Sequence, residues 1–80
     1  MHEARLCLSL IALAERQLEA AGAQRILALR VEVGDLCGVV PEALAAAFPI
    51  CAAGTRAGGA ELRLERRAGR ELMLRDMEVV

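Results

Sequence analysis

Apolar residues recur at three- and four-residue spacing in two parts of the chain, and this period predicts two helices. The first helix is predicted over residues 3–21, with an apolar stripe of Cys7, Leu10, Ile11, Ala14, Leu18 and Ala21, widened by Leu6 and Leu13. The second begins at Pro41, and its apolar face contains Leu44, Ala45, Phe48, Cys51 and Ala52. Gly22 and Gly54 are expected to end these helices. Pro49 should kink the second helix or shorten its regular part.

Elsewhere apolar and polar residues alternate, which is typical of half-buried strands. Three strands are predicted, over residues 25–34, 60–66 and 71–79. The residues expected on the inner face of the first strand are Leu27, Leu29, Val31 and Val33, with Ile26 and Ala28 on the other face. In the third strand the apolar phase changes between Leu74 and Met77. A β-bulge near residues 75–76 would restore a single buried face.

This order predicts an α/β fold of the α+β kind: a two-layer sandwich of αβαββ order, with a three-stranded mixed sheet and both helices on one face. The helix between the first two strands favours their parallel pairing. The glycine-containing turn at residues 67–70 predicts an antiparallel hairpin of the last two strands. The opposite sheet face carries Arg30, Glu32, Arg63 and Glu65 and is expected to be wet or used for contact.

Composition narrows the class of protein. The chain has 80 residues, 56% of them hydrophobic, and a single aromatic residue, so one small domain with an aliphatic core is expected over residues 1–80. A net charge of −1, without a basic stripe or stacking aromatics, argues against nucleic-acid binding. No apolar run reaches the roughly 18 residues of a membrane span.

Cysteines and candidate catalytic groups add constraints. Cys7, Cys37 and Cys51 are odd in number and widely spaced, which favours reduced, buried thiols in a cytoplasmic protein over a disulfide framework or a zinc ribbon. The short apolar run after Arg5 has the pattern of a signal peptide, but the negative charge of Glu3 is atypical of the positive start of such a peptide. Secretion is therefore not expected. There is no second histidine, no Ser/His/Asp set and no phosphate-binding loop. The sequence therefore predicts that the protein is not an enzyme.

The first three residues form the candidate metal site. His2 is the only histidine, and its imidazole lies within a few bonds of the Met1 amine and of the first backbone amides. Nitrogen donors in a near-planar set suit Ni(II) or Cu(II) better than Mg²⁺ or Ca²⁺. The alternative is that His2 is a solvated terminal residue and that Glu3 serves only the positive end of the helix dipole.

Several segments, in this order, resemble the HypA/HybF nickel-insertion proteins, metallochaperones of nickel–iron hydrogenase maturation and, in some organisms, of urease maturation. They are Met1-His2-Glu3, Arg30-Val31-Glu32-Val33-Gly34-Asp35-Leu36, Pro41-Glu42-Ala43-Leu44 and Gly59-Ala60-Glu61-Leu62, with a closing strand from Glu71 to Val79. The resemblance implies an exchangeable nickel site built from the Met1 amine, the His2 amide and imidazole, and the Glu3 amide or carboxylate. It implies the maturation GTPase and the hydrogenase large-subunit precursor as partners.

The sequence departs from this family in one large respect. Family members normally carry a zinc domain with two Cys-x-x-Cys pairs between the last two strands, whereas here only a short turn separates residues 66 and 71. Structural zinc is therefore not expected. Some relatives also place a carboxylate ligand before the second helix, but that position is Val40, and the nearby Glu42 is expected to serve the helix N-terminus.

Two functions remain open at this point. The first is a weak, exchangeable nickel carrier that passes its ion to a partner. The second is a metal-independent docking or assembly module, a degenerate family member that acts through protein contacts or as a homodimer. Nickel affinity should depend on His2 and fall below about pH 6.5 in the first case only, because protons compete with the metal for nitrogen donors.

Overall fold

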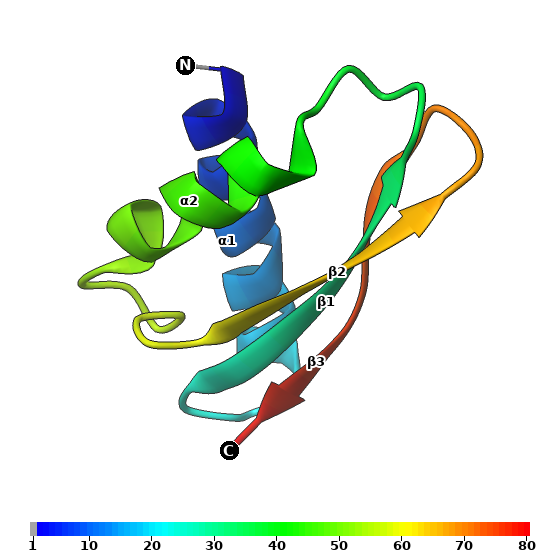
Figure 1. Cartoon of the computed structure of the whole chain (residues 1–80). Coiled ribbons are helices and arrows are strands. Elements are labelled where there is room, and N and C mark those ends of the chain that lie inside the picture. The colour runs from blue at the N-terminus through cyan, green and yellow to red at the C-terminus, as the bar shows by residue number, and fades with distance from the viewer. Residues whose placement is uncertain (1) are drawn as a thin grey trace.

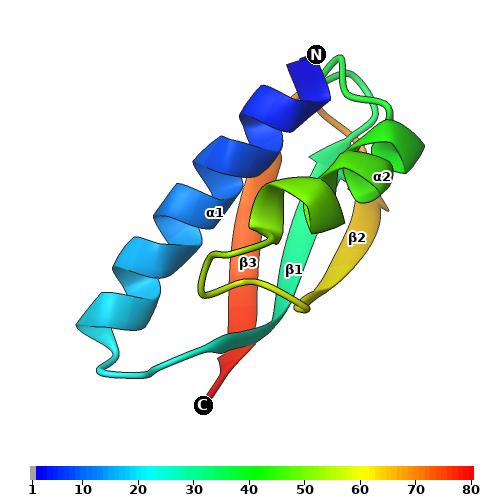
Figure 2. The same ribbon diagram turned by 90° about the vertical axis from the view of Figure 1, so that its left-hand side faces the viewer.

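The computed structural model describes residues 2–80 of the chain. Its elements are α1 (His2–Ala20), β1 (Ile26–Gly34), α2 (Pro41–Ala52), β2 (Glu61–Arg67) and β3 (Leu72–Val79) (Figure 1). Both helices cover the same face of a three-stranded mixed sheet, as the view in Figure 2 shows. The predicted two-layer α+β sandwich is confirmed. No helix within residues 2–80 combines the length and apolarity that a membrane crossing requires.

The order of strands differs from the prediction in one respect. β1 lies in the centre, paired parallel with β2 as predicted and antiparallel with β3, so the strand order is β2-β1-β3. The predicted hairpin of the last two strands is wrong, because β2 and β3 lie on opposite edges. Residues 68–71, here called the crossover loop, carry the chain across the end of β1. Four residues can span the roughly 10 Å of two strand spacings, so a short connection did not require adjacent strands.

The crossover loop is held by the end of β1. The Gly34 N–H donates to the Glu71 carbonyl and the Leu36 N–H to the Gly69 carbonyl, each at 2.8 Å. The Asp35 carboxylate accepts a hydrogen bond from the Gly69 N–H at 3.0 Å. A Cβ atom on Gly34 would lie 2.5 Å from the Gly69 carbonyl oxygen. Glycine is therefore required at the point where the loop passes over β1.

The bulge predicted in the last strand is confirmed, and a second irregularity was not foreseen. Arg30 pairs with Asp76 and Val31 with Leu74, which leaves Arg75 as the extra residue of β3. A further register shift falls between Ile26 and Ala28 of β1. Because of this shift, Ile26 and Leu27 lie on the opposite sheet faces from those predicted. Ile26 is in the core at 1% exposure, whereas Leu27 is 49% exposed. The predicted inward orientation of Leu27 is therefore wrong.

The core lies between the helices and the sheet. Its fully buried larger side chains are Phe48, Leu18, Ile26, Leu29, Leu44, Val31, Val33 and Cys7. Leu62 and Leu64 of β2 are half-buried against this core, as the strand pattern indicated. Ala21 and Ala45 are exposed, contrary to prediction, because α1 ends at Ala20 and Ala45 faces away from the sheet.

Helix ends follow the sequence closely. Gly22, two residues after the end of α1, has a φ of +69°, in the left-handed conformation expected of a helix stop. α2 starts at Pro41 and continues through Pro49 to Ala52. The nitrogen of Pro49 cannot donate to the helix, and the regular part ends three residues later, close to the predicted stop at Gly54.

Candidate metal site at the start of α1

His2 is the first helical residue of α1 and is exposed. Its imidazole makes no hydrogen bond or ion pair with any residue in the described part of the chain. The N–H groups of a first helical turn have no carbonyl four residues earlier to bond with. Metal binding at these nitrogens would thus break no helical hydrogen bond. Of the three predicted ligands Met1, His2 and Glu3, Met1 lies outside the described residues.

Glu3 is half-buried and faces a different direction from His2. Successive side chains leave a helix about 100° apart, so the imidazole and the carboxylate diverge, while the two backbone amides are adjacent. Glu3 lies one turn before Cys7, and its negative charge acts on that thiol. The arrangement favours the backbone amide of Glu3, rather than its carboxylate, as a donor beside His2.

The thiols near this end of α1 connect the two helices. The Cys7 thiol donates to the Leu44 carbonyl of α2 at 3.5 Å, and the Cys51 thiol of α2 donates to the Ala4 carbonyl at 3.7 Å. Burial raises the pKa of Cys7 to about 11, and both Cys51 and Glu3 add to the shift. Cys7 is therefore protonated at neutral pH and is a poor metal ligand.

The three cysteines are free thiols, as expected. Cys7 is buried, whereas Cys37 and Cys51 are half-buried. The expectation of a small buried hydrophobe is thus met in full only at Cys7. Within residues 2–80, no group of three or more His, Cys, Asp or Glu side chains is placed to hold a metal ion.

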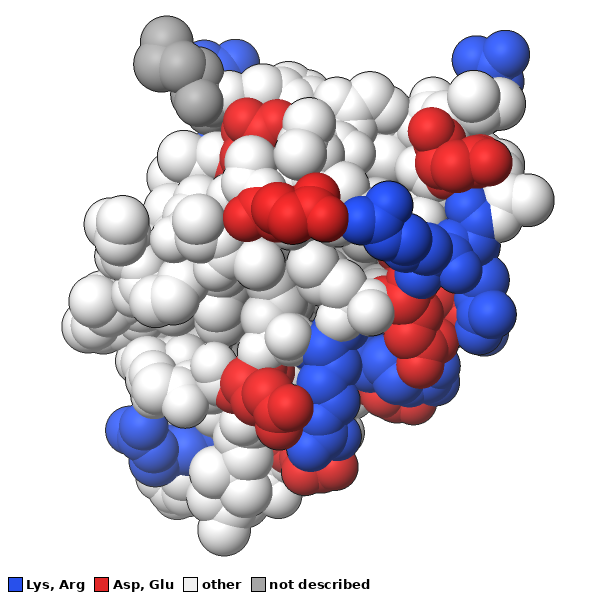
Figure 3. Space-filling model, in the orientation of Figure 1, with Lys and Arg blue, Asp and Glu red and all other residues white. Residues whose placement is uncertain are grey.

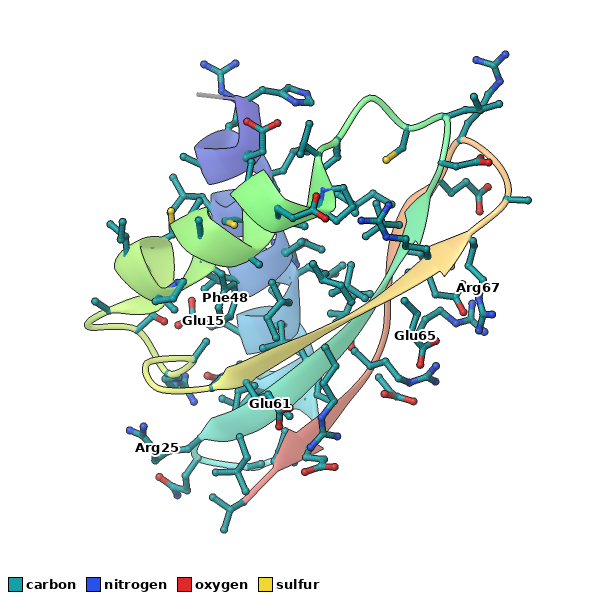
Figure 4. The ribbon with its side chains drawn as sticks, in the orientation of Figure 1. Glu15, Arg25, Phe48, Glu61, Glu65 and Arg67 are labelled. Carbon is teal, nitrogen blue, oxygen red and sulfur yellow. The ribbon has the colours of Figure 1, made fainter. Side chains whose placement is uncertain are left out.

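Polar contacts at the far end of α1 fix its orientation. The Arg56 backbone N–H donates at 3.2 Å to the carboxylate of Glu15, which Figure 4 labels, and the Arg56 guanidinium pairs with Glu19. These contacts could not be predicted from the sequence, because Arg56 comes from the loop that follows α2. Together with the thiol contacts they set the position at which the first turn of α1 is presented.

Glu42 occupies the predicted place in the first turn of α2. Its carboxylate also pairs with Arg66 of β2 at 2.7 Å. Val40 precedes the helix in an extended conformation and supplies no capping hydrogen bond. Glu42 thus has a structural partner, which is in keeping with the helix-terminus role predicted for it.

A shallow pocket lies elsewhere, beneath the crossover loop on the open face of the sheet. Its lining residues are Glu32, Leu36, Arg67, Ala68, Gly69, Arg70, Glu71 and Met73. Neither His2 nor Glu3 contributes to it. The concave part of the surface and the candidate nickel donors are therefore separate features of the molecule.

Comparison with known proteins assigns the class. Residues 1–72 match the model of the family described as "Hydrogenase/urease nickel incorporation, metallochaperone, hypA", and the chain belongs to this family. It is 55% identical over 69 residues to the hydrogenase maturation factor HypA of Deinococcus radiodurans, covering 86% of this chain and 58% of that protein. The HypA of Geobacter sulfurreducens is 43% identical over 70 residues, covering 88% of this chain and 61% of that protein.

The extent of the match is informative. The chain spans about three fifths of the length of these two relatives (58% and 61%). The matched segment includes the first turn of α1, β1, α2 and β2. It ends at residue 72, at the first residue of β3, so the predicted likeness of the closing strand is not part of the match.

Proposed function

We propose that this protein carries Ni(II) at the start of α1 and passes it to a hydrogenase maturation partner. The donors are the Met1 amine, the His2 amide and imidazole, and the Glu3 amide. The observation that carries the proposal is the state of His2, which is exposed, without a partner in residues 2–80, and the first residue of α1. Family membership supports nickel as the ion.

The architecture of this site fits exchange rather than storage. A carrier must release its ion, and an exposed terminal site with a single imidazole holds metal less tightly than an enclosed set of side chains. Within residues 2–80 no enclosed set of side chains is available to compete for the ion. The role is therefore carriage, with a maturation GTPase or a hydrogenase large-subunit precursor as the receiving protein.

We also propose that residues 1–80 act as one nickel domain without a structural zinc site. The crossover loop joins β2 to β3 through residues 68–71. It is held by the backbone N–H groups of Gly34 and Leu36 and by the Asp35 carboxylate. The fold thus closes at this point through hydrogen bonds of its own. A chelator should accordingly strip nickel without lowering the midpoint of thermal unfolding.

Calorimetric nickel titration tests the carrier function. Protein with a free Met1 amine should bind one Ni(II), and His2→Ala should weaken binding by at least about 100-fold, since it removes a direct ligand and loss of outer-shell partners alone costs 10–100-fold. A form extended by residues before Met1 should lose affinity similarly, because it lacks the amine in the chelate. Binding should weaken as pH falls, since protons compete for every donor.

Ser9→Ala is the matched control, because Ser9 is exposed on the same helix and offers no nitrogen ligand. It should bind nickel like the wild type. Equal nickel affinity of the wild type and His2→Ala would refute the carrier function. Partner binding by metal-free His2→Ala protein, at wild-type strength, would then support the docking function instead.

A further inference from the structure

The unpaired positive charge of this protein is concentrated on the outer side of α1. All ten basic residues are arginines. Within residues 2–80, Arg5, Arg16 and Arg70 are the arginines whose side chains make no hydrogen bond or ion pair; the side chains of the others are engaged. Arg5 and Arg16 are eleven positions apart, about three helical turns, so they lie on one face of α1 about 16 Å apart. These two charges are therefore available to an external partner.

Apolar surface lies beside these two arginines. Leu8 of α1 is 55% exposed and Ile50 of α2 is 79% exposed. The contact of Cys51 with Ala4 places the end of α2 against the first turn of α1, one residue before Arg5 and one turn before Leu8. Figure 3 shows largely uncharged surface on its left side, over the end of α2, whereas charges gather over the strands. An apolar patch rimmed by charge is typical of a protein contact site.

We propose that Arg5, Leu8 and Arg16 of α1, with Ile50 of α2, form a docking surface for an acidic amphipathic helix of a partner protein. The apolar side of that helix contacts Leu8 and Ile50. Two carboxylates about three turns apart pair with Arg5 and Arg16. Such a helix-to-surface contact combines apolar anchors with charge complementarity, which sets specificity and association rate.

Two other occupants fit the surface less well. A second copy of this chain would offer Glu15 and Glu19 of its own α1, but Arg56 already engages both. An anionic membrane attracts polybasic segments of several charges, whereas this face has two arginines on a chain of net charge −1. A partner helix with two spaced carboxylates matches the two unpaired guanidinium groups.

The docking surface lies next to the proposed nickel donors, and this part of the inference rests on the proposed function. His2 precedes Arg5 by three positions, so both are on the same side of α1. A helix that pairs with Arg5 therefore ends beside the imidazole. The partner that receives the ion would be held at the site of release.

The test uses a synthetic, fluorescently labelled helix of about five turns, with leucines along one face and two glutamates three turns apart. Fluorescence anisotropy should show that the peptide binds the wild-type chain. Its affinity for Arg16→Glu should be lower by at least about tenfold. Arg70→Glu is the matched control, because Arg70 is equally unpaired but lies in the crossover loop. Leu8→Asp should weaken binding, whereas Leu36→Asp, at a residue 64% exposed, should not.

Charge reversal gives a second, independent readout. A peptide with lysines in place of the two glutamates should bind the Arg5→Glu/Arg16→Glu double variant and not the wild type. Circular dichroism confirms that each variant is folded. Restored binding in the swapped pair would establish direct pairing, which a merely structural effect of the substitutions cannot produce.

Several results would overturn the docking proposal. They are the absence of peptide binding, an equal loss in Arg16→Glu and Arg70→Glu, light scattering that shows a dimer abolished by Arg16→Glu, and binding to phosphatidylserine vesicles but not to the peptide. Failure of the nickel function is seen separately. Arg16 is about 20 Å from His2 along α1, so Arg16→Glu should bind nickel normally, and His2→Ala should bind the peptide normally.

Discussion

The helical side and the open sheet face of this molecule use charge in opposite ways. On the open face, Arg30 lies between Asp76 at 2.5 Å and Glu65 at 3.1 Å. Arg67 continues the series by pairing with both Glu65 and Glu32 at 3.1 Å (Figure 4). On the helical side, Arg5 and Arg16 have no partner in the described residues. The charges of the sheet are neutralised within the chain, and the two guanidinium groups of Arg5 and Arg16 are available to other molecules.

This difference indicates where contact with other proteins is expected. Cross-strand ion pairs keep an exposed sheet hydrated, and charges near sheet edges disfavour pairing with other chains. The helical side instead combines unpaired arginines, exposed apolar residues and the free imidazole of His2. Sequence alone suggested the open sheet face as a contact surface; the paired charges there make the helical side the better candidate.

The largest effect on stability is expected from a substitution on the buried side of α2, compared with one on its exposed side. Phe48 is 2% exposed and packs in the core, so Phe48→Ala should lower the free energy of unfolding by about 3–5 kcal/mol. Ile50→Ala is the control on the same helix and should change stability by less than about 0.5 kcal/mol. Urea denaturation measures both. A large loss in Ile50→Ala would show that the outer side of α2 serves stability and would weaken its assignment to docking.

A smaller effect is expected at the crossover loop. Gly34→Ala would bring a Cβ atom to 2.5 Å from a backbone oxygen, and we expect a loss of at least about 2 kcal/mol. Gly22→Ala meets open space at a φ of +69° and should cost only about 1 kcal/mol. Thermal unfolding ranks the two. Nickel affinity of the folded Gly34→Ala protein should equal that of the wild type; a changed affinity would contradict the separation of the loop from the metal site.

The smallest effect concerns the ion pairs of the open face. A hydrogen bond from the Arg30 guanidinium holds the pKa of Asp76 below its ordinary range. A lowered pKa means that the stabilising contribution is present above about pH 4, the range of an unfolded aspartate, and is lost as pH falls through the lower folded value. Thermal unfolding between about pH 5 and pH 2 should show this loss in the wild type. Asp76→Asn should remove part of it, and Glu71→Gln, at a residue without a side-chain partner, should not.

The periodic parts of the chain were predictable because local spacing decides them. Apolar spacing and Gly22 placed α1, Pro41 placed the start of α2, and the change of phase placed the bulge at Arg75. The error at Leu27 arose because an irregularity in strand pairing, invisible in the alternation, moved Ile26 to the core face. The prediction of the strand order was wrong for a similar reason. Which strands pair depends on which strand buries the most surface in the folded chain. β1 carries fewer charges than β2, and that was the available signal.

The sequence by itself determined the helices and strands, the two-layer fold class and the family resemblance. It also showed that the single histidine is at position 2. These depend on residue types and on spacing within single segments. Only the tertiary structure decided that β1 is central, that burial raises the pKa of Cys7 and that Arg56 engages Glu15 and Glu19 of α1. Within residues 2–80 it also left the side chains of Arg5 and Arg16 without partners, on the side of α1 that carries His2. Such facts depend on which distant residues meet, because burial and pairing are properties of the packed chain rather than of any one segment.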